Sequence, residues 1–268
     1  MQKKKYKTIC FDGEFGAELL FALPFAYWHF KNGTLKKTIG AIDTRSLYFF
    51  SDNHEEAYTE RTNEGNYNYE FPRVLYSHDY NMSKWLPVPY KEHYRNNVYV
   101  YDKPLLIIAS KYNSEWDGPP VHYFDKEMLD YFISNLKHKY TIVYNRPGAK
   151  DIVVDNSDMF NLNEFDWLRN THPEVLLLKD MWQENKINAD SFNHFQLSVY
   201  ANCDNFISVH GGIATLASCF GGRNMIFSCD GGEHYFNCYQ KLFTQLSGTE
   251  IIVAESKEEL KDGVKRFL

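Results

Sequence analysis

The chain has 268 residues, of which 44% are hydrophobic and 24% are charged, and its formal net charge is −6. This length allows one large domain or two modest ones, and the apolar content is sufficient to bury a core. The acidic balance argues against a bulk nucleic-acid binder. No apolar run approaches the roughly 18 residues that a membrane span requires.

The cysteines are odd in number, and their spacing fits no zinc-binding pattern. They are Cys10, Cys203, Cys219, Cys229 and Cys238. The basic start Lys3-Lys4-Lys5 is not followed by an apolar segment of signal-peptide length. We therefore expect reduced thiols in a cytoplasmic chain, and no metal site.

The first 50 residues predict one strand–turn–helix unit and further strands. Residues 6–11 favour a strand, residues 12–16 a turn, and residues 17–30 a helix that ends at Asn32-Gly33. Pro24 is expected to kink or split that helix. Residues 38–42 predict a second strand and residues 46–50 a short third one.

Residues 51–101 show no sustained period, and stretches of this length often carry function. Beyond them, apolar runs alternate with amphipathic segments, which is typical of an open parallel sheet covered by helices. Strands are expected at residues 105–109, 141–144, 175–179, 205–209, 225–228 and 251–254. Helices are expected at residues 125–139, 191–201, 213–220, 235–246 and 257–267.

The strongest candidate binding site is the turn His210-Gly211-Gly212, between a strand and a helix. In open parallel sheets, ligands bind beyond the carboxyl ends of the strands. The glycines let a ligand approach the backbone closely. The free N–H groups of Ile213, Ala214 and Thr215, with the helix dipole, favour an anion such as a diphosphate. The Thr215 hydroxyl and the His210 ring would add hydrogen bonds.

Side chains after other strands should converge on the same edge of the sheet. Lys111 follows the strand at 105–109, and Asn145 and Arg146 follow the strand at 141–144. Lys111 and Arg146 would supply cations for phosphate, and an Arg suits bidentate contact. Glu233, in the loop after the strand at 225–228, is placed to accept hydrogen bonds from ribose hydroxyls.

The segment 196–222, QLSVYANCDNFISVHGGIATLASCFGG, resembles the donor-binding half of GT-B glycosyltransferases. The turn Gly13-Glu14-Phe15-Gly16 resembles the loop after the first strand of that fold. The resemblance implies an α/β fold with two Rossmann-like α/β/α domains that face a cleft, residues 1–103 and 104–268. The chain is short for such an enzyme, so the N-terminal domain would be reduced.

The resemblance further implies a glycosyltransferase of polysaccharide biosynthesis. The C-terminal domain would bind a UDP- or GDP-sugar, and the N-terminal domain would bind a glycan or another hydroxyl acceptor. Transfer would be inverting and independent of metal, with no cofactor, because cations and backbone amides neutralise the leaving diphosphate. A carboxylate or a histidine must act as the base that takes the proton of the acceptor hydroxyl. The candidates are Glu14, then Asp12, and Asp79 in the aromatic stretch 76–80.

Two other classes of protein remain open. One is another nucleotide-binding enzyme on the same kind of sheet, an epimerase or a hydrolase. The chain lacks the GxGxxG and G-x-S-x-G patterns that would favour either. The other is a non-catalytic nucleotide-binding module that keeps the fold but not the chemistry.

Overall fold

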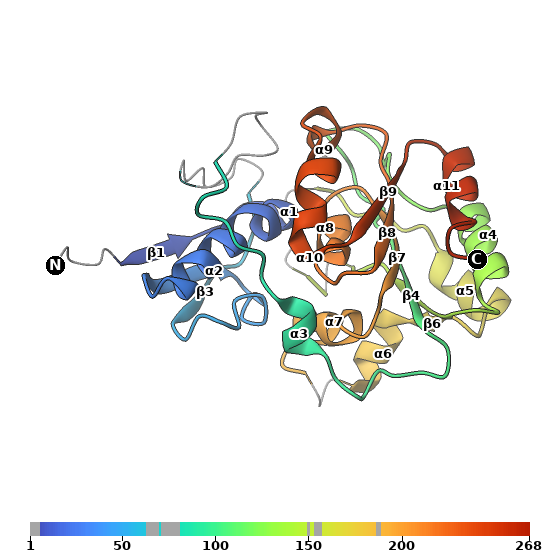
Figure 1. Ribbon diagram of the computed structural model, residues 1–268. Helices are drawn as coiled ribbons and strands as arrows, with labels where there is room; N and C mark the ends of the chain where they lie inside the picture. The colour runs from blue at the N-terminus through green and yellow to red at the C-terminus, as the bar shows by residue number, and fades with distance from the viewer. Residues whose placement is uncertain (1–5, 63–69, 71–80, 149–150, 153–156, 186–188) are drawn as a thin grey trace.

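A computed structural model describes residues 6–62, 70, 81–148, 151–152, 157–185 and 189–268. Two parallel α/β units are visible in Figure 1, a small N-terminal one and a larger C-terminal one. The N-terminal unit comprises β1 (Lys7–Cys10), α1 (Phe15–Ala17), the π-helical turn η1 (Glu18–Ala22), α2 (Leu23–Lys31), β2 (Leu35–Ala41) and β3 (His54–Tyr58). Its sheet has the order β1-β2-β3, and both strand pairs are parallel.

The sequence predicted a kink or a split at Pro24, and the structure has a continuous run with a π-helical turn immediately before the helix that contains this proline. One helical run extends from Phe15 to Lys31, and its π-helical turn ends immediately before α2. Pro24 lies in the first turn of α2, where its missing N–H removes no hydrogen bond within that helix. Residues 17–26 of this run are all buried, and Leu19, Leu20 and Phe25 are among those in the core.

The third strand of this sheet is not where the sequence predicted it. Residues 46–50 form turns, although Leu47 and Tyr48 are buried, and the third strand is His54–Tyr58. This strand is at the edge of the sheet, and Glu55 and Glu56 are exposed. An edge strand that faces solvent does not need an alternating apolar pattern, so its sequence resembles a loop.

The C-terminal unit is built around a six-stranded sheet. Its strands are β4 (Leu105–Ala109), β5 (Thr141–Asn145), β6 (Leu176–Leu177), β7 (Asn205–Val209), β8 (Arg223–Phe227) and β9 (Glu250–Ala254). Its helices are α4 (Lys126–Leu136), α5 (Glu164–Thr171), α6 (Leu178–Asn185), α7 (Phe192–Tyr200), α8 (Gly212–Ser218), α9 (Gly232–Tyr235), the π-helical η3 (Tyr239–Phe243), α10 (Thr244–Ser247) and α11 (Lys257–Val264). A further short helix, α3 (Tyr90–Tyr94), packs against α7.

All strand pairs of this sheet are parallel, in the order β6-β5-β4-β7-β8-β9. The chain winds outward from β4 to β6, returns to β7 beside β4, and then winds the other way. This doubly wound order creates a switch point between β4 and β7, where ligands characteristically bind. The expected fold class, a parallel α/β protein of two units with a reduced N-terminal one, is confirmed.

Helices cover both faces of the large sheet, so its central strand β4 is apolar along its whole length. Leu106 and Ile108 of β4 pack in one core cluster with α4, α5 and α11. Leu105 and Ile107 belong to a second cluster with α7, α8 and η3. The expected strand at 175–179 is reduced to two residues because helix α6 begins at Leu178.

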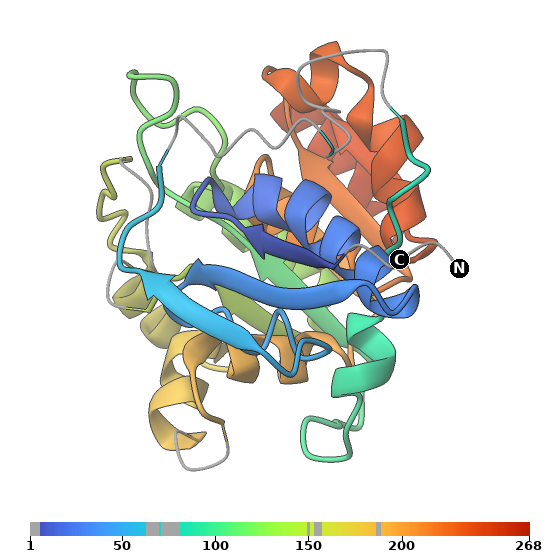
Figure 2. The same ribbon diagram turned by 90° about the vertical axis from the view of Figure 1, so that its left-hand side faces the viewer.

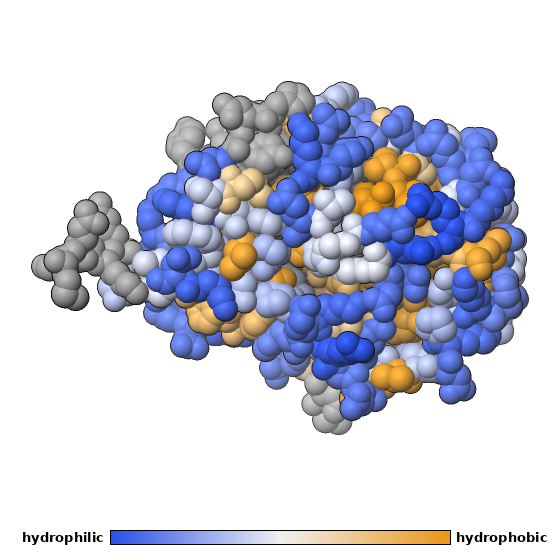
Figure 3. Space-filling view, in the orientation of Figure 1, coloured by the Kyte–Doolittle hydropathy of each residue, from blue (hydrophilic) through white to orange (hydrophobic). Residues whose placement is uncertain are grey.

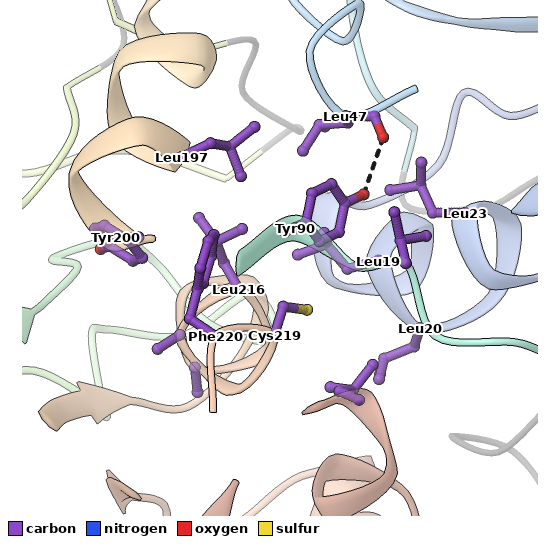
Figure 4. Packing of buried hydrophobic residues seen from close by; sticks show 14 of the residues in the cluster. Leu19, Leu20, Leu23, Leu47, Tyr90, Leu197, Tyr200, Leu216, Cys219 and Phe220 are labelled. Atoms are coloured by element: carbon purple, nitrogen blue, oxygen red, sulfur yellow. Dashed lines mark hydrogen bonds between the residues drawn. The ribbon is translucent and has the colours of Figure 1, made fainter. Parts of the chain in front are cut away.

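The second core cluster continues into the N-terminal unit, so the two units share a hydrophobic core. In Figure 4, Tyr90 of α3 lies among Leu19 and Leu23 of the first helical run and Cys219 and Phe220 at the end of α8. The Tyr90 hydroxyl donates a hydrogen bond to the carbonyl of Leu47, at 3.1 Å. The end-on view of Figure 2 shows the three-stranded sheet in front of the six-stranded one.

The face of the molecule in Figure 3 is mainly hydrophilic, with an apolar area over the edge strand β9. Ile251, Ile252 and Val253 of that strand are half-buried. In the part of the chain that the structure describes, no helix combines the length and the apolar character required to cross a membrane.

Candidate functional site

A cavity of about 420 Å³ lies between the two units, at the switch point of the large sheet. The N-terminal unit contributes Glu14, Phe15, Gly16, Ala17, Ile42 and Arg61 to its wall. The C-terminal unit contributes loops that follow β4, β5, β7 and β8. Because the carboxyl ends of parallel strands meet at one edge, residues far apart in sequence surround the same space. The volume lies within the range of small-molecule sites.

Gly211 and Lys111 lie next to each other on this wall. Gly211 has φ +98°, a conformation that favours glycine, and a Cβ placed there would lie 3.5 Å from Nζ of Lys111. The ammonium group is held by the carboxylate of Glu115, with Nζ 3.0 Å from Oε2. A cation is therefore fixed beside an open stretch of backbone, which is an arrangement suited to an anion.

Gly212 has a different role, because the N-terminal unit packs directly on it. A Cβ at Gly212 would lie 3.0 Å from both the amide nitrogen of Gly16 and Cδ1 of Phe15. Both glycines line the cavity. The absence of side chains here lets α1 approach the start of α8, so Gly212 joins the two units closely.

His210 and Glu233 form a nearly buried pair on the cavity wall. Nε2 of His210 lies 3.3 Å from Oε2 of Glu233, and Nδ1 lies 2.9 Å from Oγ of Ser228. Burial raises the pKa of Glu233 to about 7. Burial, with the charge of Lys111, lowers the pKa of His210 to about 3. Between about pH 3 and pH 7 both side chains are therefore uncharged, with the proton on the Glu233 carboxyl.

A second histidine, His122, lies directly beneath His210. The two rings are stacked, with centroids 4.6 Å apart. Nδ1 of His122 lies 2.7 Å from Oε2 of Glu115, whose Oε1 accepts the backbone N–H of His122 at 2.8 Å. Although burial alone would raise the pKa of Glu115, the hydrogen bond from His122 and the charge of Lys111 lower it to about 2. Glu115 therefore links Lys111 to the paired histidines.

Glu115 and His122 were not among the residues predicted from the sequence. Both lie in the loop between β4 and α4, which begins at the predicted site edge. That position was the available signal, since loops at a switch point often carry function. Position in the loop could not show that the two residues pair, because the ring of His122 reaches Glu115 only after the loop turns back on itself.

That reversal is a tight turn at residues 115–118, with mutual backbone hydrogen bonds between Glu115 and Gly118. Trp116 and Asp117 occupy it with φ values of +50° and +61°. Positive φ is unusual for a bulky side chain. The turn leaves the indole of Trp116 57% exposed on the cavity wall, 5.8 Å from the rings of both His122 and His210.

Asn145 and Arg146 do not line the cavity, although Pro147 does. The amide of Asn145 donates to Gln196 at 2.6 Å and to the Tyr200 hydroxyl at 2.7 Å. The guanidinium of Arg146 binds the carboxylate of Glu164, with Nη2 3.1 Å from Oε2. Both of these predicted ligand residues instead connect β5 to neighbouring helices, a role that their position after the strand did not reveal.

Ala214 and Thr215 are also absent from the cavity wall and are fully buried. The Thr215 hydroxyl donates to the carbonyl of Gly211 at 3.2 Å, and the backbone N–H groups of both residues bond to the same carbonyl. The Gly211 carbonyl therefore pairs two of the three N–H groups that were predicted to face a ligand, whereas the third residue, Ile213, lines the cavity.

Of the predicted catalytic acids, Glu14 lines the cavity from the N-terminal side. It precedes α1 and does not cap it with its side chain. Asp12 is half-buried outside the lining, and its Oδ1 has no hydrogen-bond partner among the described residues. Asp79 lies outside the described residues.

Arg61 is a further cation on the wall that the sequence analysis did not select. Its Nη2 lies 2.7 Å from Oε2 of the fully buried Glu18, and its Nη1 donates to the carbonyl of Gly13 at 2.9 Å. The pair holds the turn that carries Glu14. Among the described residues, no cluster of three or more His, Cys, Asp or Glu side chains is arranged to bind a metal ion.

The fold is that of a doubly wound α/β protein, with a cavity at its switch point. No protein-family model matches the chain, and no curated protein matches it. A structure of the wall teichoic acid polymerase TagF aligns with 90% of this chain and 52% of that chain, at 11% identity and a TM-score of 0.35. A variant of that polymerase soaked with CDPG aligns with 90% of this chain and 52% of that one, at 12% identity and a TM-score of 0.32.

The chain thus spans about half the length of the structures that it matches. At these TM-scores, the similarity assigns neither a family nor an activity.

Proposed function

We propose that the protein is a glycosyltransferase that takes a sugar from a nucleotide-diphosphate donor, and that the cavity between its two units binds both substrates. One observation carries the proposal: the ammonium group of Lys111 is held beside the open backbone of Gly211 at the switch point of the sheet. Positive charge and backbone amides at such a position suit the diphosphate of a nucleotide.

The distribution of the other groups supports transfer rather than binding alone. The predicted donor side is formed by the C-terminal loops, which carry Lys111 and Glu233, and the predicted acceptor side by the N-terminal unit, which carries Glu14. Glu14 is the proposed base for the acceptor hydroxyl, a glycan hydroxyl in our interpretation. Asp12 is the second candidate, although it lies outside the lining.

Charge compensation for the leaving diphosphate would come from Lys111 and the backbone of the Gly-Gly turn. Phosphate oxygens would compete with Glu115 for the Lys111 ammonium, which lies 3.0 Å from that carboxylate. We propose inverting transfer from a UDP- or GDP-sugar without a metal ion. Glu233, with its raised pKa, is proposed to bind the ribose hydroxyls.

Calorimetry with UDP, GDP, CDP and NAD tests the donor site. We expect a nucleoside diphosphate to bind, and Lys111→Gln to weaken its binding by at least about tenfold, or roughly 1.4 kcal/mol. Lys137→Gln is the matched control, because Lys137 is an exposed lysine that pairs with Glu174 on the surface. Binding of NAD alone, or equal affinity in the wild type and Lys111→Gln, would refute the proposal.

Mass spectrometry of donor turnover tests the chemistry. With a sugar nucleotide that binds and an acceptor glycan, Glu14→Gln should reduce transfer by about a hundredfold or more while nucleotide affinity remains unchanged. Epimerised donor, in place of a transferred sugar, would identify the alternative nucleotide-binding enzyme. Tight binding without turnover of any sugar nucleotide would identify a non-catalytic module.

A further inference from the structure

The loop after β8 places the exposed thiol of Cys229 against the buried pair of His122 and Glu115. Cys229 itself lies outside the cavity lining. Sγ of Cys229 lies 3.4 Å from Nε2 of His122, and Nδ1 of the same ring lies 2.7 Å from Oε2 of Glu115. Cys229 is exposed, whereas the side chains of His122 and Glu115 are 0% and 5% exposed. A nucleophile, a base and an acid that orients the base therefore stand in line.

The backbone fixes the tautomer that this arrangement needs. The N–H of Cys229 donates to Nε2 of His122 at 3.1 Å, so Nε2 carries a lone pair and Nδ1 carries the proton. Nδ1–H then donates to Glu115, whose pKa is lowered to about 2, so the acid remains an anion. The lone pair that accepts this N–H also faces the thiol, with Sγ 3.4 Å away, and it takes the thiol proton as it releases the backbone N–H.

We propose that Cys229, His122 and Glu115 form a nucleophilic triad, and that Cys229 exchanges with small uncharged or cationic disulfides. His122 removes the thiol proton as Sγ attacks one sulfur of the disulfide. The S–S bond breaks, and the departing thiolate takes the proton back from Nε2. The products are a mixed disulfide on Cys229 and one free thiol, so the thiol is oxidised as the reagent is reduced. Glu115 is a positioning residue, since it acts through His122.

The surroundings of the thiol determine this mechanism and this class of reagent. Burial, with the adjacent charge of Asp230, raises the pKa of Cys229, and Glu115 and Glu255 raise it further. The thiol is therefore protonated at neutral pH, and attack requires a base rather than a preformed thiolate. The same carboxylates repel an anionic disulfide and attract a cationic one. The proposed exchange shares Glu115 with the proposed donor site, where this carboxylate holds Lys111, whereas Cys229 lies outside the cavity lining.

The test is the rate at which Cys229 in the whole protein is modified by cystamine, measured by mass spectrometry with peptide mapping. At pH 7 we expect Cys229 to react at least about tenfold faster than N-acetylcysteine, because a positioned base contributes that much or more. His122→Asn should remove this advantage. His138→Asn, which changes an exposed histidine, should retain it. Cys229→Ser should remove the modified peptide.

The pH profile separates catalysis from simple accessibility. A thiol that reacts only as its anion accelerates about tenfold per pH unit below its pKa. We expect His122→Asn to show this slope between about pH 7 and pH 8, and the wild type to change much less. The pH dependence of the rate in Glu115→Gln should become steeper, toward that of His122→Asn. A purely structural role of Glu115 would not produce this change.

If a variant does not fold, rate measurements on the wild-type protein alone can still overturn the proposal. A Cys229 rate no greater than that of N-acetylcysteine, or a tenfold rise per pH unit in the wild type, would exclude base activation. Equal rates with cystamine and with anionic oxidised glutathione at low salt would exclude the assigned class of disulfide. We expect cystamine to react several times faster, with a difference that decreases as salt is added.

Discussion

Nε2 of His210 lies 3.3 Å from Oε2 of Glu233, yet the two side chains do not form an ion pair at neutral pH. Burial raises the pKa of the acid to about 7 and lowers that of the histidine to about 3. The proton therefore resides on the carboxyl group below about pH 7. The cavity thus contains an acid that is poised to titrate near neutral pH, which is a property of many functional sites.

Replacing this acid should change how stability depends on pH. The pKa of Glu233 rises from 4.5 to about 7 on folding, so its contribution to stability is fully present below about pH 4.5 and is lost as pH rises through 7. The shift corresponds to about 3 kcal/mol. From about pH 5 to pH 8, the free energy of unfolding of the wild type should fall by up to that amount relative to that of Glu233→Gln. Urea unfolding at several pH values measures this, and parallel profiles for the two proteins would contradict it.

Arg146 should contribute to the stability of the protein more than to ligand affinity. Its guanidinium and the Glu164 carboxylate are both nearly buried, and Glu164 also accepts the Tyr144 hydroxyl at 3.3 Å. Arg146→Ala would leave that carboxylate buried without its cation, at a cost of about 3–5 kcal/mol. We expect this loss in urea unfolding, with nucleotide affinity changed less than tenfold.

A second variant makes the prediction for Arg146 specific to the ion pair. Arg146→Met combined with Glu164→Leu removes both charges and should recover much of the stability. If Arg146→Ala instead retained its stability and lost nucleotide binding, the side chain would be a phosphate ligand, as its place after β5 first indicated.

The fold could be predicted from the sequence where burial dominates the pattern. β4 is buried on both faces, so its run LLIIA is readable as a central parallel strand. The alternation of strands and helices around it then indicates an open parallel sheet covered by helices. The sequence could not place β3, because the exposed Glu55 and Glu56 leave no apolar period. The two-residue β6 was equally inaccessible, since α6 starts inside the apolar run from which a longer strand was predicted.

The site could be predicted where a residue lies shortly after a strand and lines the cavity. Lys111 after β4 and Gly211 after β7 fulfil both conditions, and Glu233 lines the cavity from α9, after β8. Arg146 fulfils only the first, because Glu164 binds its guanidinium from helix α5. The link between Glu115 and His122 depends on a turn with positive φ at Trp116, a conformation that the residue types do not favour. Side-chain partners set by such turns cannot be read from spacing alone.

Gly231 should be indispensable to this site because of its neighbours as well as its backbone conformation. It has φ +105°, and a Cβ there would lie 2.6 Å from Cε1 of His210 and 3.0 Å from Cζ2 of Trp116. Gly248 has φ +78° but no atom within 4 Å of such a Cβ, so it isolates the backbone cost. Gly248→Ala should lower the free energy of unfolding by about 1–2 kcal/mol. Gly231→Ala should lower the free energy of unfolding by about 1–3 kcal/mol more, because the rings of His210 and Trp116 must shift.

The rings that would shift also line the proposed donor site, so the two alanine variants should differ in binding as well as in stability. Gly231→Ala is expected to weaken nucleotide binding, whereas Gly248→Ala should bind as the wild type does at a temperature where both are folded. Urea unfolding and calorimetry on the pair separate the two effects. Equal losses of stability would mean that His210 and Trp116 move aside freely, and the cavity wall would then be less rigid than its close packing implies.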